Sequence, residues 1–176
     1  GLRVVVAFAG EPAKLPADAS AAHAAWLEHG GSTSAELPPP PPGGWNLVVD
    51  ALFGIGLQRP LDGRYAGWIA TLNAQPCPRL ALDIPSGLDA DSGRRLGPCF
   101  AASHTVSFIA LKPGLLTLDG PDQCGELHLQ EIDVDAEALA PAPGHEITPA
   151  LFAGRLAPRA RNSHKGSYGD AALIGG

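Results

Sequence analysis

The sequence has little of several features on which whole classes of protein depend. Its 176 residues contain no methionine, 3 cysteines, 6% aromatic residues and 17% charged residues. No apolar run approaches the roughly 20 residues that a helix needs to cross a bilayer. The chain also shows no basic start followed by the apolar core of a signal peptide. We therefore expect neither a membrane-spanning nor an exported protein.

Positive charge is also scarce. The 12 Lys and Arg residues face 18 Asp and Glu residues, which gives a formal net charge of -6 at pH 7. Binding to phosphate backbones depends on clustered Lys and Arg. The composition therefore predicts no nucleic acid and no membrane among the partners.

The cysteines Cys77, Cys99 and Cys124 are odd in number and far apart in the sequence. Their spacing predicts neither a disulfide framework nor a CxxC metal motif. We expect reduced, structural thiols, which are typical of a cytoplasmic protein. The 6 histidines show no HExxH pattern and no paired spacing, so we predict no metal role for them.

Both ends of the chain lie next to apolar runs. The sequence opens on a dense β-branched run at residues 2–8 and stops directly after the apolar residues 171–174. Chain ends usually lie in exposed, loosely held segments. We therefore expect a piece of a longer protein, truncated at both ends.

Apolar runs alternate with turn residues and amphipathic segments, which is typical of an α/β protein with a mostly parallel sheet. Residues 2–8 have the continuous apolar character of a strand buried on both faces, and residues 47–53 and 79–84 predict two further strands. Residues 105–109 predict another strand, and residues 126–132 alternate as a half-exposed edge strand does.

Two helices are expected between these strands. Asp18 or Ser20 can cap the first, which ends at Gly30. The second begins after residues 60–62 and places three apolar side chains on one face: Trp68, Ile69 and Leu72.

Two proline-containing stretches interrupt the pattern. Residues 38–42 are consecutive prolines, which predict a stiff surface linker, with recognition of the PxxP run as the functional alternative. Residues 136–144 are rich in Ala and Pro and mark a boundary. Beyond them Thr148 can cap a short helix through residues 151–152, and residues 171–174 predict a last strand.

The first candidate site follows the strand predicted at residues 47–53. The run DALFGIGLQRP, residues 50–60, places a glycine loop between a strand end and a helix start. Such a loop lets the backbone approach a phosphate closely, although neither GxGxxG nor a P-loop is present. Nucleotide binding and an ordinary tight turn fit this spacing equally well.

The second candidate site is DIPSG, residues 83–87, at the end of the next strand. The carboxyl edge of a parallel sheet is where ligands bind in open α/β proteins. Asp83 suits acid-base chemistry or ligation of a hard cation, while the plainer alternative is a turn in which Asp83 or Ser86 caps backbone amides. Lys112 follows a later strand and faces either an anionic substrate or, as most loop lysines do, solvent.

Four segments, residues 50–63, 80–93, 104–114 and 125–134, follow one another in an order and spacing that resemble the NAD(P)H-hydrate epimerase domain of the YjeF N-terminal type. The pairing of DALFGIG with DIPSGLDADSG carries most of the specificity. The final run NSHKGSYGDAALIGG, residues 162–176, resembles the entry into an ADP-dependent NAD(P)H-hydrate dehydratase domain of ribokinase-like fold.

The resemblance implies a Rossmann-like, three-layer α/β/α domain over residues 1–140, with residues 141–176 as a linker and the opening of the dehydratase domain. It implies an isomerase that interconverts the R and S epimers of hydrated NADH and NADPH (NADHX and NADPHX) in cofactor repair. The partner is then a small dinucleotide, the cofactor is a potassium ion, and ADP or ATP serves only the dehydratase domain. A cytoplasmic homo-oligomer is expected.

The site residues of the family fall on the motifs described above. By this match Asp50 and Ser86 are potassium ligands, Asp83 is a catalytic and substrate-binding carboxylate, and Lys112 is a catalytic lysine near the site. The rest of the match is a substrate-contacting loop comprising Gly54, Ile55, Gly56, Leu57, Gln58, Arg59 and Pro60.

One element of the family pattern is not found. Its glycine-rich loop, of the form NNGGDG, precedes the strand that matches residues 2–8 and supplies a further potassium ligand and part of the phosphate cradle. The alternative function is therefore an inactive or non-catalytic fragment that binds a nucleotide or a protein. A kinase of ribokinase fold would need that fold's later motifs beyond residue 176.

Overall fold

A computed structural model describes residues 3–134, 144–154, 158, 160–168, 170 and 172 of the chain. Two compact units divide the chain, Gly1–Ala136 and Glu137–Gly176. The domain boundary expected at residue 140 lies outside the described residues. Within the described part, no helix is both long and apolar enough to span a membrane.

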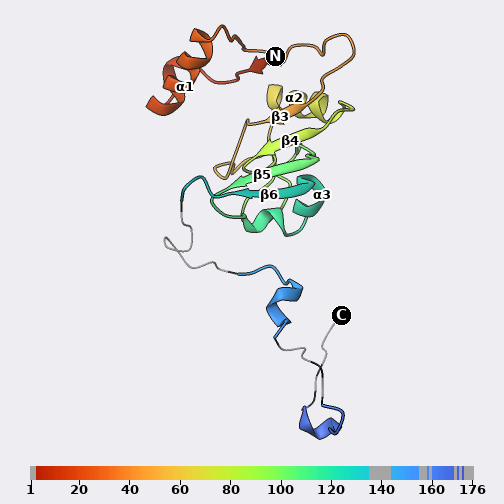
Figure 1. Cartoon of the computed structure of the whole chain (residues 1–176). Coiled ribbons are helices and arrows are strands. Elements are labelled where there is room, and N and C mark those ends of the chain that lie inside the picture. The colour runs from red at the N-terminus through yellow and green to blue at the C-terminus, as the bar shows by residue number, and fades with distance from the viewer. Residues whose placement is uncertain are drawn as a thin grey trace. The chain divides into compact units, whose positions relative to one another are not determined.

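The first unit is built on a sheet of four strands, β3 (Val48–Asp50), β4 (Arg79–Leu82), β5 (His104–Phe108) and β6 (Glu126–Gln130). They lie side by side in this order, and every neighbouring pair is parallel (Figure 1). Parallel neighbours need a crossover connection instead of a hairpin. The parallel α/β class predicted from the sequence is confirmed.

Helix α2 (Gly63–Asn73) provides the apolar face that the sequence predicted. Its residues Trp68, Ile69 and Leu72 are buried, and the last two pack in one core cluster with Val48 and Phe100. The helix follows Asp62, which takes the N-cap position. This helix leads the chain away from the glycine loop that ends β3.

In the second core cluster, glycines let neighbouring backbone segments come into close contact. The cluster joins the loop after β4 to two short helices, η2 (Pro113–Leu115) and α3 (Gly120–Cys124). A Cβ placed on Gly114 would lie 2.2 Å from the Asp89 carbonyl oxygen, and one on Gly93 would lie 2.0 Å from the Thr117 carbonyl oxygen. Only glycine permits such approaches. Neither short helix was predicted from the sequence.

The N-terminal segment differs from its prediction. Helix α1 (Ala17–Glu28) and η1 (Pro12–Lys14) connect β1 (Val6–Ala7) to β2 (Thr33–Ser34), and the two strands form a separate parallel pair. A strand does form within residues 2–8, as expected, but it covers only Val6–Ala7, and the expected burial on both faces is wrong. Val4 is 57% exposed, because β1 pairs only with β2 and not with the four-stranded sheet.

The predicted cap of the first helix is also wrong. Pro16 holds the N-cap position with no side-chain hydrogen bond, and Asp18 lies inside the first turn. An acidic side chain is favourable there because it faces the positive end of the helix dipole. The proline run at residues 38–42 forms no helix or strand, as a linker should.

Two predicted strands end earlier than expected, for a local reason in each case. Strand β3 stops at Asp50, whose side chain accepts a hydrogen bond from the Leu52 amide and starts a turn. Strand β4 stops before Asp83, whose φ of 71° is left-handed. Strand β6 takes the edge position that its alternating pattern predicted.

The second unit contains two short 3-10 helices, η3 (Pro149–Phe152) and η4 (Lys165–Ser167). Thr148 precedes the first at the N-cap position, as expected, but its side chain makes no capping hydrogen bond. The last strand predicted, residues 171–174, lies outside the described residues apart from Ala172, which is in no regular element.

Candidate functional site

The candidate site begins with a buried pair at the carboxyl end of the sheet. Asp50 ends β3 and Ser86 lies in the loop after β4, and both side chains are buried. The Ser86 hydroxyl donates to Asp50 Oδ1 at 2.7 Å, and the Ser86 amide donates to Oδ2 at 2.8 Å. These two bonds fix the loop after β4 to the end of β3.

The loop that leaves β3 closes over this pair. The Leu52 amide donates to Asp50 Oδ1 at 3.1 Å, and the Phe53 amide donates to the Ser86 hydroxyl at 3.0 Å. The Phe53 carbonyl oxygen lies 3.4 Å from the Ser86 hydroxyl. Three kinds of oxygen, carboxylate, hydroxyl and carbonyl, therefore converge at one point.

Burial raises the pKa of Asp50, an effect that the hydrogen bonds from Ser86 and Leu52 partly offset. None of the ion pairs formed by the described side chains involves Asp50. A buried carboxylate without a cationic partner is costly. Carboxylate, hydroxyl and carbonyl oxygens are the ligands that hard cations prefer, so this cluster is a candidate cation site.

Asp83 and Lys112 form a second, half-buried pair beside the first. The Lys112 ammonium contacts Asp83 Oδ1, and their side chains are only 16% and 23% exposed. Lys112 also donates to the Ser107 hydroxyl at 3.0 Å and to the Phe108 carbonyl at 2.9 Å. Of the two orientations open to Lys112, the solvated one is therefore wrong.

The glycine loop meets Asp83 through Gly54. A Cβ placed on Gly54 would lie 2.8 Å from Asp83 Oδ2, the oxygen that Lys112 does not engage. Leu57 points into the first core cluster instead. The other side chains predicted for the loop are exposed to solvent at positions Ile55, Gln58, Arg59 and Pro60, and Gly56 is exposed as well.

A cavity of about 350 Å³ opens next to this loop within the first unit. Its walls come from the chain after β1 and from Ala51, Leu52, Phe53 and Tyr65. The Arg64 guanidinium donates to the Ala9 carbonyl beside it. Tyr65 stands edge-on to Phe53 with ring centres 5.1 Å apart. The sequence analysis missed Tyr65, although its place just after the start of the helix that follows the glycine loop was the signal available.

These features define an α/β domain whose candidate site lies at the carboxyl edge of a parallel sheet, where ligands bind in open α/β proteins. The family described as "YjeF-related protein N-terminus" matches residues 1–114. The chain belongs to this family, which has a Rossmann-like fold.

The relatives carry consistent names. The chain is 39% identical to the bifunctional NAD(P)H-hydrate repair enzyme Nnr of Vibrio cholerae, over 100% of this chain and 36% of the relative. It is 44% identical to the NAD(P)H-hydrate epimerase of Bordetella pertussis (strain Tohama I), over 82% of this chain and 64% of the relative. The chain thus spans about a third of the length of the bifunctional relatives.

Proposed function

We propose that this chain forms the epimerase part of a NAD(P)H-hydrate repair enzyme and interconverts the R and S epimers of NADHX and NADPHX. Family membership and the names of the relatives support the class of reaction. The observation that carries the proposal is Asp83, held at the sheet edge between Lys112 and the glycine loop.

Asp83 is suited to the chemistry of this epimerisation. In this proposal the hydroxyl is protonated and leaves as water, the ring nitrogen's lone pair forms an iminium-like cation, and water adds to the other face with loss of a proton. A nearby carboxylate can move the proton and stabilise the cation. Lys112 binds Oδ1 and leaves Oδ2 facing Gly54 and the loop. In this proposal Oδ2 holds or takes the proton, and Lys112 positions the carboxylate.

Asp50, Ser86 and the Phe53 carbonyl are the groups that would hold a potassium ion. The ion supplies positive charge to the buried carboxylate. Because Phe53 belongs to the loop after β3 and Ser86 to the loop after β4, the Asp50 cluster fixes both loops in relation to Asp83.

The tail belongs to a wider proposal about the parent protein. Since the match with the Vibrio cholerae relative extends over the whole chain, residues 141–176 are proposed as the linker and opening of an ADP-dependent or ATP-dependent dehydratase domain. The three free cysteines favour a cytoplasmic location, and we propose a homo-oligomer that acts on a small dinucleotide.

The test is conversion of R-NADHX to the S epimer in potassium buffer. The chain, a version extended upstream, and the variant Asp83→Ala in each are compared, with Asp91→Asn as a control at an exposed position in the same loop. We expect turnover that Asp83→Ala abolishes and Asp91→Asn keeps. Undiminished epimerisation by Asp83→Ala would refute the role of Asp83. NADHX binding without turnover in both lengths would favour the non-catalytic binding fragment.

A further inference from the structure

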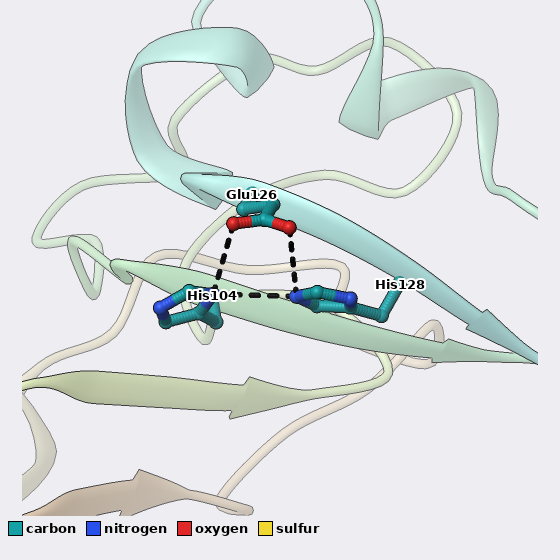
Figure 2. Close-up of side chains that lie close together, drawn as sticks. All are labelled: His104, Glu126 and His128. Atoms are coloured by element: carbon teal, nitrogen blue, oxygen red, sulfur yellow. Dashed lines mark hydrogen bonds and ion pairs between the residues drawn. The ribbon is translucent and has the colours of Figure 1, made fainter.

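Three side chains with metal-binding atoms meet at the opposite end of the sheet from Asp50. His104 is the first residue of β5, Glu126 is the first residue of β6, and His128 lies two residues further along β6. The register pairs His104 with Glu126. Alternate residues of a strand share a face, so all three side chains come together, as Figure 2 shows.

The three donor atoms converge. His104 Nδ1 lies 3.2 Å from His128 Nε2, and each of these nitrogens lies 3.7 Å from an oxygen of Glu126. The imidazole rings stack with centres 5.5 Å apart, which keeps the two nitrogens at this spacing.

These separations match tetrahedral ligation. Ligand atoms about 2.1 Å from a tetrahedral zinc ion stand about 3.4 Å from one another. The two nitrogens are 3.2 Å apart, close to that distance, and each lies 3.7 Å from a different oxygen of Glu126, Oε2 for His104 and Oε1 for His128. A hydrogen bond joins the two imidazole nitrogens in the metal-free chain, but the contacts of 3.7 Å to the carboxylate are longer than hydrogen bonds.

We propose that His104, Glu126 and His128 bind a divalent transition metal ion of the zinc class, with water as the fourth ligand. Two imidazole nitrogens select zinc, copper or nickel over magnesium and calcium, which prefer oxygen. The three side chains are 46%, 68% and 44% exposed, so water reaches the open position. This site is separate from the potassium ligands, which lie at the carboxyl ends of the strands.

The ion would act as a clamp on the edge of the sheet. Strand β6 pairs only with β5 among the described strands. A metal held by one residue of β5 and two of β6 joins the strands at the point where their pairing begins. Because the assembled site exists only in the folded chain, metal binding adds its free energy to the stability of the fold.

Zinc titration of the metal-stripped chain tests the proposal, by calorimetry and by thermal unfolding. We expect one zinc ion per chain and a higher Tm with zinc, while magnesium has no effect. His128→Gln and Glu126→Gln should each weaken zinc binding by more than about 10-fold. His145→Gln and Glu131→Gln, matched exchanges at exposed positions outside the cluster, should leave it unchanged.

One further variant and one further metal probe distinguish this site from metal binding by a cysteine. Cys77→Ser removes the one cysteine that is not fully buried and should leave zinc binding intact. Cobalt in place of zinc should give visible bands typical of nitrogen and oxygen ligands, without a thiolate band. The proposal is overturned if the unmodified chain binds no zinc, or if His128→Gln, folded with an unchanged metal-free Tm, binds zinc as tightly as the unmodified chain.

Discussion

Asp50 combines deep burial with hydrogen bonds only to neutral groups, and this sets how its charge affects stability. Burial places its folded-state pKa above the usual 3.8. The folded chain therefore holds this proton more tightly than the unfolded chain does. The stabilising contribution is full below the unfolded pKa and is lost as the pH rises through the folded pKa. At neutral pH a bound cation would offset this loss.

The first prediction follows from this sign. At pH 7, potassium chloride should raise the Tm above its value in tetramethylammonium chloride of equal ionic strength, by about 2–4 °C for each kcal/mol of binding free energy. The difference should shrink as the pH falls, because the raised pKa of Asp50 lets this carboxyl take up a proton before an exposed one does. Asp50→Asn should remove both effects. Scanning calorimetry measures them, and an equal potassium effect on Asp50→Asn would contradict the assignment.

The second prediction concerns the contact between Gly54 and Asp83. Gly54→Ala places a methyl group 2.8 Å from Asp83 Oδ2 and should displace the carboxylate. We expect a loss of epimerase activity of about 100-fold, since small misplacements at a reacting centre cost about that much. Gly67→Ala is the control, because Gly67 lies in α2, outside the substrate-contacting loop, and a Cβ there meets no atom within 4 Å. Steady-state kinetics of the two variants decide the point, and similar rates would rule out the contact as a positioning device.

The sequence predicted those parts of the site that follow from the order of the strands, and it missed the contacts that depend on the chain path and on strand register. Asp50 and Asp83 each lie near the carboxyl end of a predicted strand, residues 47–53 and 79–84, so their position at one sheet edge followed from strand order alone. The ion pair of Lys112 depends on the path of the chain after β5, which no pattern encodes. The pairing of His104 with Glu126 depends on strand register, and the sequence offered no sign of it.

At the scale of elements, the fold relies on close backbone contacts as much as on side chains. The chain after β4, η2 and the start of α3 meet at Gly93, Gly114 and Gly120. The sequence predicted α2 from the spacing of its apolar residues, but it could not predict η2 and α3. These short helices depend on tertiary contacts between backbone segments, and a glycine in the sequence does not identify the segment that packs against it.

The third prediction tests these contacts. Gly114→Ala should lower the free energy of unfolding by about 3 kcal/mol or more, because its methyl group would overlap the carbonyl oxygens of Asp89 and Ala90. Gly67→Ala, in α2 with open space around it, should instead stabilise the chain by about 0.5–1 kcal/mol. Urea unfolding measures both variants. Equal stabilities would mean that the backbones can separate at low cost.

The run at residues 2–8 shows the converse error, in which the sequence pattern predicts burial that the structure does not have. Its apolar character satisfied the rule for a buried strand, but burial depends on partners on both sides. Strand β1 has one partner, β2, and Val4 and Val5 remain exposed. A local pattern reports what a segment can bury, whereas the sheet order decides what it does bury.

At the scale of the whole molecule, the reactivity of the buried cysteine thiols measures how often the first unit unfolds. Burial raises the pKa of Cys99 to about 12 and that of Cys124 to about 11, which suppresses their thiolates. Cys77 is only partly buried. Cys77 packs against the first core cluster from a partly exposed position, whereas Cys99 and Cys124 are buried members of the second.

The fourth prediction is a reactivity experiment on the intact chain. At pH 8 a disulfide reagent such as DTNB should modify Cys77 first, and Cys99 and Cys124 should react only at the rate of global unfolding. Cys77→Ser should remove the fast phase. Fast reaction of all three thiols in native buffer would mean that the second core cluster opens locally.

The parallel sheet also constrains how fast the chain can find its fold. Register partners such as Val48 and Arg79, or Leu80 and His104, are more than twenty residues apart in sequence. No hairpin is available to start the sheet, so each strand must close a long loop before pairing repays its entropy. Refolding of the first unit should therefore take milliseconds to seconds.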